Sequence, residues 1–265
     1  MFGNRQSPAA AHEVVWQAEQ LYIAGFIFGC CDRCHSEKDK LMKFNRYTLD
    51  DCHQATGIVL IIDVLRAFST AAYAFSRGAK EIRLVSSIDE ALEMKSQIFN
   101  AKAMGEVGGL PPEGFDFGNS PTRILEYDLT GITLIQRTGA GTQGAVRAVN
   151  ADVMLATSFV VAQATINYVL KLKPTELSFV ITGGLSNDED IACADYLEKR
   201  FTDQAVEAQG FVKRVHASRD ALQHMEEHPQ FPYADLDYCS RIDNFDFAMP
   251  IERKDGFLIM QAVRP

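Results

Sequence analysis

Residues 57 to 70 place polar and charged side chains directly after an apolar run. The segment reads GIVLIIDVLRAFST, so the apolar run ends at Asp63, and Arg66, Ser69 and Thr70 follow closely. A carboxylate in this position can bind a hard cation such as Mg²⁺. An arginine can hold a phosphate or carboxylate group through two parallel hydrogen bonds, and hydroxyls can help to cap the next helix around an anion. This combination predicts chemistry on a phosphoryl group.

Four further predicted strands are followed by groups of the same kind. Ligands of open α/β sheets bind at the carboxyl ends of the strands, so we expect these groups to converge. Carboxylates are predicted to act in catalysis at Asp63, Glu106 and Asp116, and to hold Mg²⁺ at Asp63, Glu106, Asp116 and Asp190. The residues predicted to bind substrate or phosphate are Arg66, Ser69, Thr70, Asn119, Ser120, Arg137, Thr138, Gly141, Thr142 and Ser158.

Each of these motifs also has a structural interpretation. A single aspartate at a strand end can cap a helix. Glu189 and Asp190 can serve only to complement a helix dipole. The loop RTGAGT at 137–142 resembles a phosphate-binding loop, yet it is neither a Walker motif nor the dinucleotide-binding motif. The convergence of several such loops, rather than any one of them, favours the functional interpretation.

Short β-branched runs alternate with segments of helical periodicity from residue 57 onward. This alternation predicts a mostly parallel sheet with helices on both faces. The tail FAMPIERKDGFLIMQAV places two apolar runs around Asp255-Gly256, which indicates an antiparallel hairpin. We therefore predict a three-layer α/β fold over residues 57–265, with a mixed sheet and a C-terminal hairpin. Residues 1–56 are interpreted as a helix at about 10–24 followed by a connector, with no assigned domain. The predicted strands are 58–63, 81–85, 102–106, 132–136, 152–156 and 177–184, and the predicted helices are 67–77, 87–99, from 120, 142–149, 158–172 and 187–201. Ser87, Ser120 and Ser158 are predicted to cap three of these helices.

The charge of the chain argues against several classes of partner. The 265 residues carry a formal net charge of −9, which offers no electrostatic surface for nucleic acid or anionic lipid. The best membrane candidate, LYIAGFIFG at 21–29, is shorter than the roughly 20 residues of a membrane span. It follows acidic residues, so it is not read as a signal peptide either. We expect a cytoplasmic protein that binds no nucleic acid and no membrane.

The cysteines allow three interpretations. Cys31-Asp-Arg-Cys34-His35 matches the c-type haem pattern, but haem attachment needs export, for which the sequence has no signal. A zinc site is the second option, although it would lack two well-spaced ligand pairs. Reduced thiols in a cytosolic chain are favoured, with Cys193 and Cys239 in the core. The candidate zinc ligands are Cys30, Cys31, Cys34, His35, Cys52 and His53.

Three ordered motifs resemble the 2-phosphosulfolactate phosphatase family. They are IDVLRAFSTAAYAFSRGAKEI, GFDFGNSP and EDIACADYL, within residues 57 to about 200, while the tail DLDYC…FDFAMP fits more loosely. The resemblance implies a Mg²⁺-dependent phosphomonoesterase that converts 2-phospho-3-sulfolactate to sulfolactate and phosphate in coenzyme M biosynthesis. The implied partner is a small anionic phosphate ester, and a homodimer is left open. The alternative is a non-catalytic binder or sensor of a small phosphorylated acid.

Two loops differ from the family pattern. Val107 stands where the family commonly has arginine in Gly-Glu-Arg, and Arg137 begins a loop that commonly reads Thr-Thr-Asn-Gly-Thr. We hypothesise that Arg137 replaces the missing arginine. Position 65 is leucine, whereas phosphatases of the haloacid dehalogenase type have a second aspartate two residues after the nucleophile. Direct attack by a metal-activated water is therefore preferred over an aspartyl intermediate, and both routes stay open.

Overall fold

The computed structural model describes residues 42–184, 188–225 and 228–265. The helix predicted at about 10–24 and the motif from Cys30 to His35 lie outside these residues. Among the cysteines that are described, Cys52, Cys193 and Cys239 are all buried. The prediction that Cys193 and Cys239 are core residues is confirmed.

A mixed sheet forms the centre of the described fold, as predicted, and it has nine strands. Its order is β1-β7-β2-β6-β8-β9-β3-β5-β4, and most neighbouring pairs are parallel. The predicted C-terminal hairpin is β8 and β9, which lies inside the sheet rather than at its edge. The strands are β1 (Lys43–Tyr47), β2 (Gly57–Ile62), β3 (Glu81–Leu84), β4 (Ala101–Gly105), β5 (Thr133–Arg137), β6 (Ala151–Thr157), β7 (Glu176–Ile181), β8 (Met249–Lys254) and β9 (Phe257–Met260).

The hairpin divides the sheet into two parallel groups that run in opposite directions. Strand β8 is antiparallel to β6, β9 to β8, and β3 to β9. Consequently β3, β5 and β4 are reversed relative to β1, β7, β2 and β6. The mixed sheet is confirmed, but the reversal means that the expected convergence of the strand ends does not follow from parallel strand order alone.

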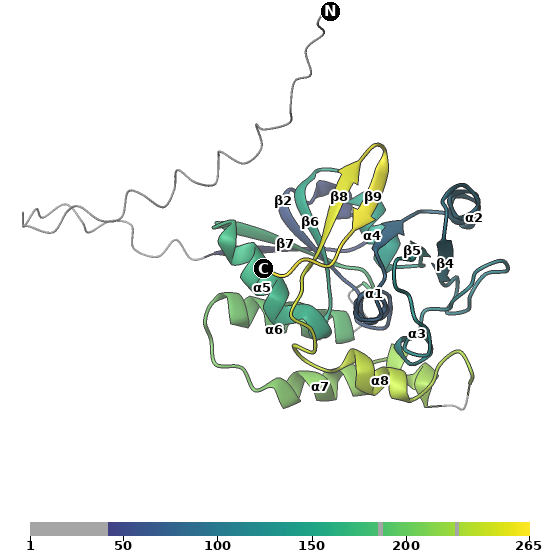
Figure 1. Ribbon diagram of the computed structural model, residues 1–265. Coiled ribbons are helices and arrows are strands. Elements are labelled where there is room, and N and C mark those ends of the chain that lie inside the picture. The colour runs from purple at the N-terminus through teal and green to yellow at the C-terminus, as the bar shows by residue number, and fades with distance from the viewer. Residues whose placement is uncertain (1–41, 185–187, 226–227) are drawn as a thin grey trace, which may run out of the picture. The chain divides into compact units, whose positions relative to one another are not determined.

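Eight α-helices cover the sheet within the described residues. Figure 1 shows α1 close to end-on, with β2, β6 and β7 on one side of it and β5 and β4 on the other. Predicted helices are confirmed at α1 to α6, including the Ser87 and Ser120 caps, whose hydroxyls accept from the backbone N–H of Glu90 and Arg123. The helices are α1 (Ala67–Ser76), α2 (Ile88–Gln97), α3 (Pro121–Ile124), α4 (Gly141–Arg147), α5 (Ala162–Lys171), α6 (Asp188–Phe201), α7 (Ala208–Ala217) and α8 (Ala234–Cys239).

The apolar run of β2 serves both faces of the sheet. Val59 and Ile61 pack in one core cluster with the apolar side chains of α1, whereas Leu60 and Ile62 pack in another with those of α5 and α6. The cluster around α1 also contains Ile82 from β3, so both strand groups pack on this helix. Strand alternation explains why a continuous apolar run precedes Asp63.

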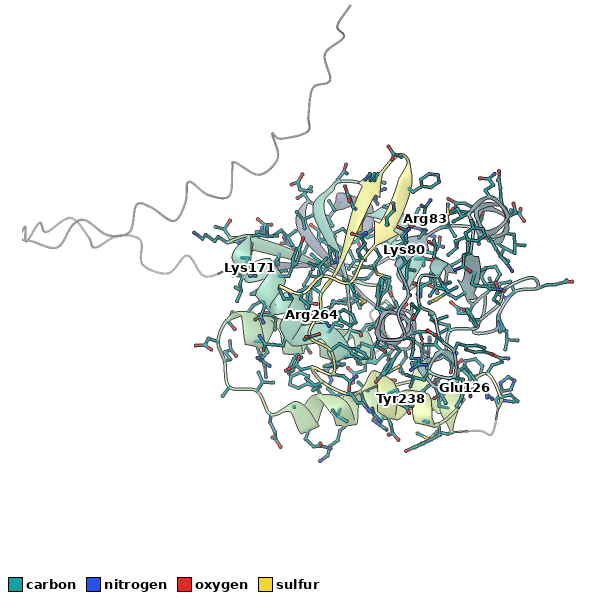
Figure 2. The ribbon with its side chains drawn as sticks, viewed as in Figure 1. Lys80, Arg83, Glu126, Lys171, Tyr238 and Arg264 are labelled. Carbon is teal, nitrogen blue, oxygen red and sulfur yellow. The ribbon has the colours of Figure 1, made fainter. Side chains whose placement is uncertain are left out.

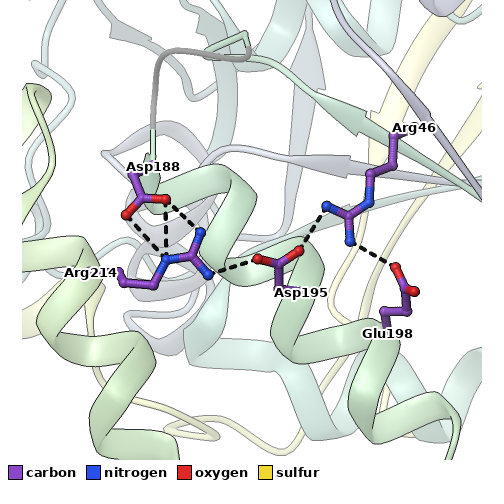
Figure 3. A network of polar contacts seen from close by, with 5 residues as sticks. All are labelled: Arg46, Asp188, Asp195, Glu198 and Arg214. Atoms are coloured by element: carbon purple, nitrogen blue, oxygen red, sulfur yellow. Dashed lines mark hydrogen bonds and ion pairs between the residues drawn. The ribbon is translucent and has the colours of Figure 1, made fainter.

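Helix α7 and strand β1 are tied to α6 by alternating charges (Figure 3). The guanidinium of Arg214 on α7 binds Asp188 and Asp195 of α6. Arg46 of β1 binds Asp195 and Glu198. Neither β1 nor α7 was predicted from the sequence. β1 lies in the predicted connector, where it is a short edge strand parallel to β7.

Charged side chains cover the outside of the fold. Figure 2 shows Glu126, Lys171 and Arg264 on the surface, and all three are exposed. No helix in the described part of the chain is long and apolar enough to cross a membrane.

Candidate active site

A cavity of about 400 Å³ lies where β2, β4 and β5 end, with a wall from the C-terminal part of the chain. We call it the strand-end cavity. Although the two strand groups run in opposite directions, packing on α1 brings these ends together: the side-chain amide of Gln136 on β5 donates to the carbonyl of Ala67 at the start of α1. The residues that line the strand-end cavity are Asp63, Leu65, Arg66, Glu106, Gly108, Gly109, Asn119, Gly139, Ala140, Arg219, Asp220, Gln223, His224 and Phe231.

Asp63 is a buried residue that directly follows β2, and it lines the strand-end cavity. Its Oδ1 accepts a hydrogen bond of 2.8 Å from the backbone N–H of Ala67, the first residue of α1. A Cβ on Gly141 would lie 2.7 Å from Oδ2, so only glycine allows the α4 loop to approach this closely. Burial raises the pKa of Asp63 to about 6 against the hydrogen bond from Ala67, and the charge of Glu106 acts in the same direction as burial. Positive charge beside Asp63 would therefore be favourable.

Glu106 joins the two glycine-containing loops that form one side of the cavity. One carboxylate oxygen accepts from the backbone N–H of Gly109 at 2.7 Å, and the other accepts from Gly139 at 2.5 Å. Each oxygen keeps a lone pair for a ligand. The residue thus fixes its own loop and still presents negative charge to the cavity.

Arg66 is held rigidly beside Asp63. Its Nη1 donates to the carboxylate of Asp235 and to the carbonyl of Gln230, both at 2.7 Å, and its guanidinium lies 4.7 Å from the ring centre of Phe231. The Arg66 and Asp235 side chains are 4% and 0% exposed. Asp235 in turn accepts from the hydroxyl of Ser120, so Ser120 supports this arginine from behind.

Two more acids lie beneath Asp63 at the start of α6. The carboxylate of Asp190 accepts from the backbone N–H groups of Val64 and Gly183. Oε2 of Glu189 is buried and has no hydrogen-bond partner among the described residues. Burial raises the pKa of Glu189 to about 7, and the charges of Asp220 and Asp63 add to this shift. Burial, with the charges of Asp63 and Glu189, also raises the pKa of Asp190.

Several predicted phosphate-binding residues do not line the cavity. The hydroxyl of Ser69 donates to the carbonyl of Val64, and Thr138 and Thr142 each accept from the other's backbone N–H. These three hydroxyls stabilise the loops that carry the site. The hydroxyls of Thr70 and Ser158 are buried and have no partner in the described structure, and Ser158 makes no capping hydrogen bond.

Asp116 and Arg137 are also placed away from the cavity. The carboxylate of Asp116 pairs with Lys95 and Lys102, whose hydrogen bonds help to lower its pKa against the effect of burial. The guanidinium of Arg137 donates to the backbone carbonyls of Glu106 and Ser86. Of the predicted site residues, those that line the cavity are Asp63, Arg66, Glu106 and Asn119, with Gly141 and Asp190 directly behind Asp63.

The C-terminal wall was missed by sequence reasoning. It consists of Arg219, Asp220, Gln223, His224 and Phe231. All five come after helix α7, and Asp220, Gln223 and His224 lie in the 3₁₀ helix η3 (Asp220–His224). No predicted strand ends in this segment, so the strand-end argument could not find it. The available signal was the density of histidine and charged residues around LQHMEEH.

The donor set suits Mg²⁺ only in part. No group of three or more His, Cys, Asp or Glu side chains in the described ranges is arranged to hold a metal ion. Mg²⁺ usually binds through one or two carboxylates, with water and substrate phosphate completing its shell. Asp63 and Glu106 line one cavity and repel each other, as the raised pKa of Asp63 indicates. Two such oxygen donors fit a Mg²⁺ ion that shares its shell with a phosphate.

Comparison with known proteins identifies the family. The sequence model of the 2-phosphosulpholactate phosphatase family matches residues 45–254, a range that includes every residue of the strand-end cavity. The chain belongs to the 2-phosphosulfolactate phosphatase family. The match extends beyond the three motifs of the sequence analysis and takes in the C-terminal wall.

Individual relatives agree with this assignment. A probable 2-phosphosulfolactate phosphatase of Bacillus subtilis (strain 168) is 35% identical over 202 residues, covering 75% of this chain and 88% of that protein. A second probable 2-phosphosulfolactate phosphatase, from Carboxydothermus hydrogenoformans, is 34% identical over 222 residues, which cover 78% of this chain and 91% of that protein. A third, from Thermotoga maritima, is 29% identical over 196 residues, which cover 70% of this chain and 85% of that protein.

The buried acids predict a pH-dependent stability in metal-free protein. Glu189 has a pKa of about 7 when folded and an ordinary value of 4.5, so the folded state holds the extra proton between these values. The free energy of unfolding should therefore fall as pH rises from 4.5 to 7 and then level off. Glu189→Gln should weaken this decline by up to about 3 kcal/mol. Urea unfolding of both proteins in EDTA at several pH values measures the free energy of unfolding.

Glu126→Gln provides a matched control because Glu126 is exposed. Its stability should follow the wild-type pH curve. Parallel curves for wild type and Glu189→Gln would contradict the assignment of a buried, protonated Glu189.

Proposed function

We propose that the chain is a Mg²⁺-dependent phosphatase that hydrolyses 2-phosphosulfolactate to sulfolactate and phosphate. The observation that carries the proposal is the meeting of Asp63, Glu106 and Arg66 in one cavity of a chain from this family. The relatives' names support the reaction and the substrate. The choice of Mg²⁺ as the metal rests on the oxygen donors of the Asp63 and Glu106 carboxylates.

The residues of the cavity have complementary tasks. Arg66 is fixed by Asp235 and presents a rigid cation to the phosphoryl group. Asn119 is 6% exposed and its Oδ1 has no partner among the described residues, so it can orient a water molecule or a hydroxyl of the ligand. Mg²⁺, held by Asp63 and Glu106, would neutralise the phosphate and make a water more acidic.

A comparison of two aspartates tests the role of the cavity carboxylates. Asp63→Asn should lower kcat by about 100-fold or more, since a charge that stabilises the transition state through the metal is lost. Asp116→Asn should leave kcat within about threefold and reduce only stability, because Asp116 forms ion pairs with Lys95 and Lys102 and does not line the cavity. Phosphate release from 2-phosphosulfolactate with Mg²⁺ or with EDTA provides the measurement.

Full activity in excess EDTA would contradict the Mg²⁺ proposal. Equal losses in Asp63→Asn and Asp116→Asn would contradict the placement of the site.

Arg219 is the cation best placed to recognise the remaining acid groups of the substrate. It lines the cavity from the C-terminal wall, and its Nε lies 3.3 Å from Asp220. Arg66 is already paired with a buried carboxylate, so a substrate with several negative charges gains most from Arg219. Arg137 does not line the cavity, and its guanidinium donates to the backbone carbonyls of Ser86 and Glu106.

Variants of Arg219 and Arg137 therefore test which of the two arginines binds the remaining acid groups of the substrate. Arg219→Gln should raise KM for 2-phosphosulfolactate about 10- to 100-fold with little change in kcat, the effect of losing one charge-assisted hydrogen bond. Arg137→Gln should leave KM within about threefold. Steady-state kinetics with both variants is the measurement, and the reverse pattern would restore Arg137 as the substrate-binding cation.

A further inference from the structure

His224 is a buried imidazole in the wall of the strand-end cavity for which the proposed function so far gives no task. It is 4% exposed and ends the 3₁₀ helix η3. Its ring packs edge-on against Phe231, with ring centres 5.6 Å apart and an interplanar angle of 89°. The same Phe231 ring supports the guanidinium of Arg66. The imidazole and the phosphate-binding arginine are thus positioned by one aromatic side chain.

One hydrogen bond fixes how the imidazole can act. Nδ1 of His224 lies 2.9 Å from the carbonyl oxygen of Pro232. A carbonyl oxygen only accepts, so Nδ1 must carry a hydrogen in both the neutral and the charged ring. Nε2 has no hydrogen-bond partner among the described residues, and it is the nitrogen left to exchange a proton with a ligand.

Three charged side chains act on the imidazole of His224, namely Arg66, Asp235 and Asp220. Burial lowers the pKa of His224, and the guanidinium of Arg66 acts in the same direction. The hydrogen bond to Pro232 opposes this, as do the carboxylates of Asp235 on α8 and Asp220 on η3 itself. The protonated ring is therefore a better acid than free histidine, and a bound phosphate dianion favours its formation.

We propose that His224 donates the proton that the leaving alcohol oxygen requires when the phosphate ester is cleaved. This inference rests on the proposed function. Sulfolactate leaves through an alkyl oxygen, which is a poor leaving group unless it is protonated as the bond breaks. The geometry gives His224 a fixed tautomer, a free Nε2 and a place in the cavity wall beside Arg66.

The step balances with water as the only co-substrate. The bond between phosphorus and the ester oxygen breaks, and its electron pair remains on that oxygen. The proton on Nε2 moves to the same oxygen and gives the alcohol. The oxygen of a water molecule forms the new bond to phosphorus, and the proton it loses returns through solvent to Nε2.

Leaving-group dependence provides the test. The variant His224→Asn can keep a donor near the Pro232 carbonyl but lacks Nε2. It should lower kcat for 2-phosphosulfolactate about 100-fold or more, the usual contribution of a general acid. For p-nitrophenyl phosphate, whose leaving group departs as a stable anion, kcat should fall less than about fivefold. A purely structural role would lower both activities together.

His228→Asn is the matched control. His228 also touches Phe231 and borders the neighbouring open depression, which His224 shares, but it does not line the strand-end cavity. This variant should keep both activities within about threefold. Equal losses on the two esters in folded His224→Asn, or no loss on either, would overturn the proposal.

Wild-type pH profiles keep the proposal testable if His224→Asn does not fold. For the alkyl ester, kcat/KM should decline as pH rises through the His224 pKa, which lies below the ordinary value of 6.5. For p-nitrophenyl phosphate this decline should be absent, and identical profiles would contradict the proposal. If wild-type protein released phosphate from neither ester, the proposed function itself would fail, and the inference with it.

Discussion

The burial of the Asp63 carboxylate at the end of β2 is the constraint on which the site depends. An ionised carboxylate is stable there only if its surroundings supply hydrogen bonds or positive charge. The chain supplies the backbone N–H of Ala67, and glycine at position 141 lets the α4 loop reach Oδ2. Three other acids, Glu106, Glu189 and Asp190, lie nearby and add repulsion. The raised pKa values of Asp63, Glu189 and Asp190 mean that their charged forms are disfavoured here without added positive charge, which is the condition expected of a cation site.

The arrangement of the sheet explains how these groups meet. Insertion of β8 and β9 reverses β3, β5 and β4 relative to β2, so simple parallel packing cannot place their ends together. Both strand groups instead pack on α1, and β5 and the loop after it lie against the first residue of this helix, Ala67. Glu106 then joins these two loops through Gly109 and Gly139. The hydroxyls of Ser69, Thr138 and Thr142 support this geometry instead of binding a ligand.

Sequence reasoning predicted what depends on local pattern. The apolar run before Asp63, the Ser87 and Ser120 caps and the Asp255-Gly256 hairpin each follow from a short segment, and each is confirmed. It could not distinguish a hydroxyl that faces a cavity from one that closes a turn, because both occur after strands. Asp116 illustrates this limit: its neighbours Lys95 and Lys102 come from other elements and are brought to it only by the fold. His224 and Arg219 were missed because the segment after α7 has no strand end to mark it.

A crystal soaked with MnCl₂ and phosphate would test the central claim most directly, since Mn²⁺ binds the same oxygen ligands as Mg²⁺ and can be located by anomalous scattering. We expect a manganese peak in contact with Asp63 and Glu106, with a phosphate between it and Arg66. A peak at Asp116, or phosphate bound without metal at Asp63, would contradict it.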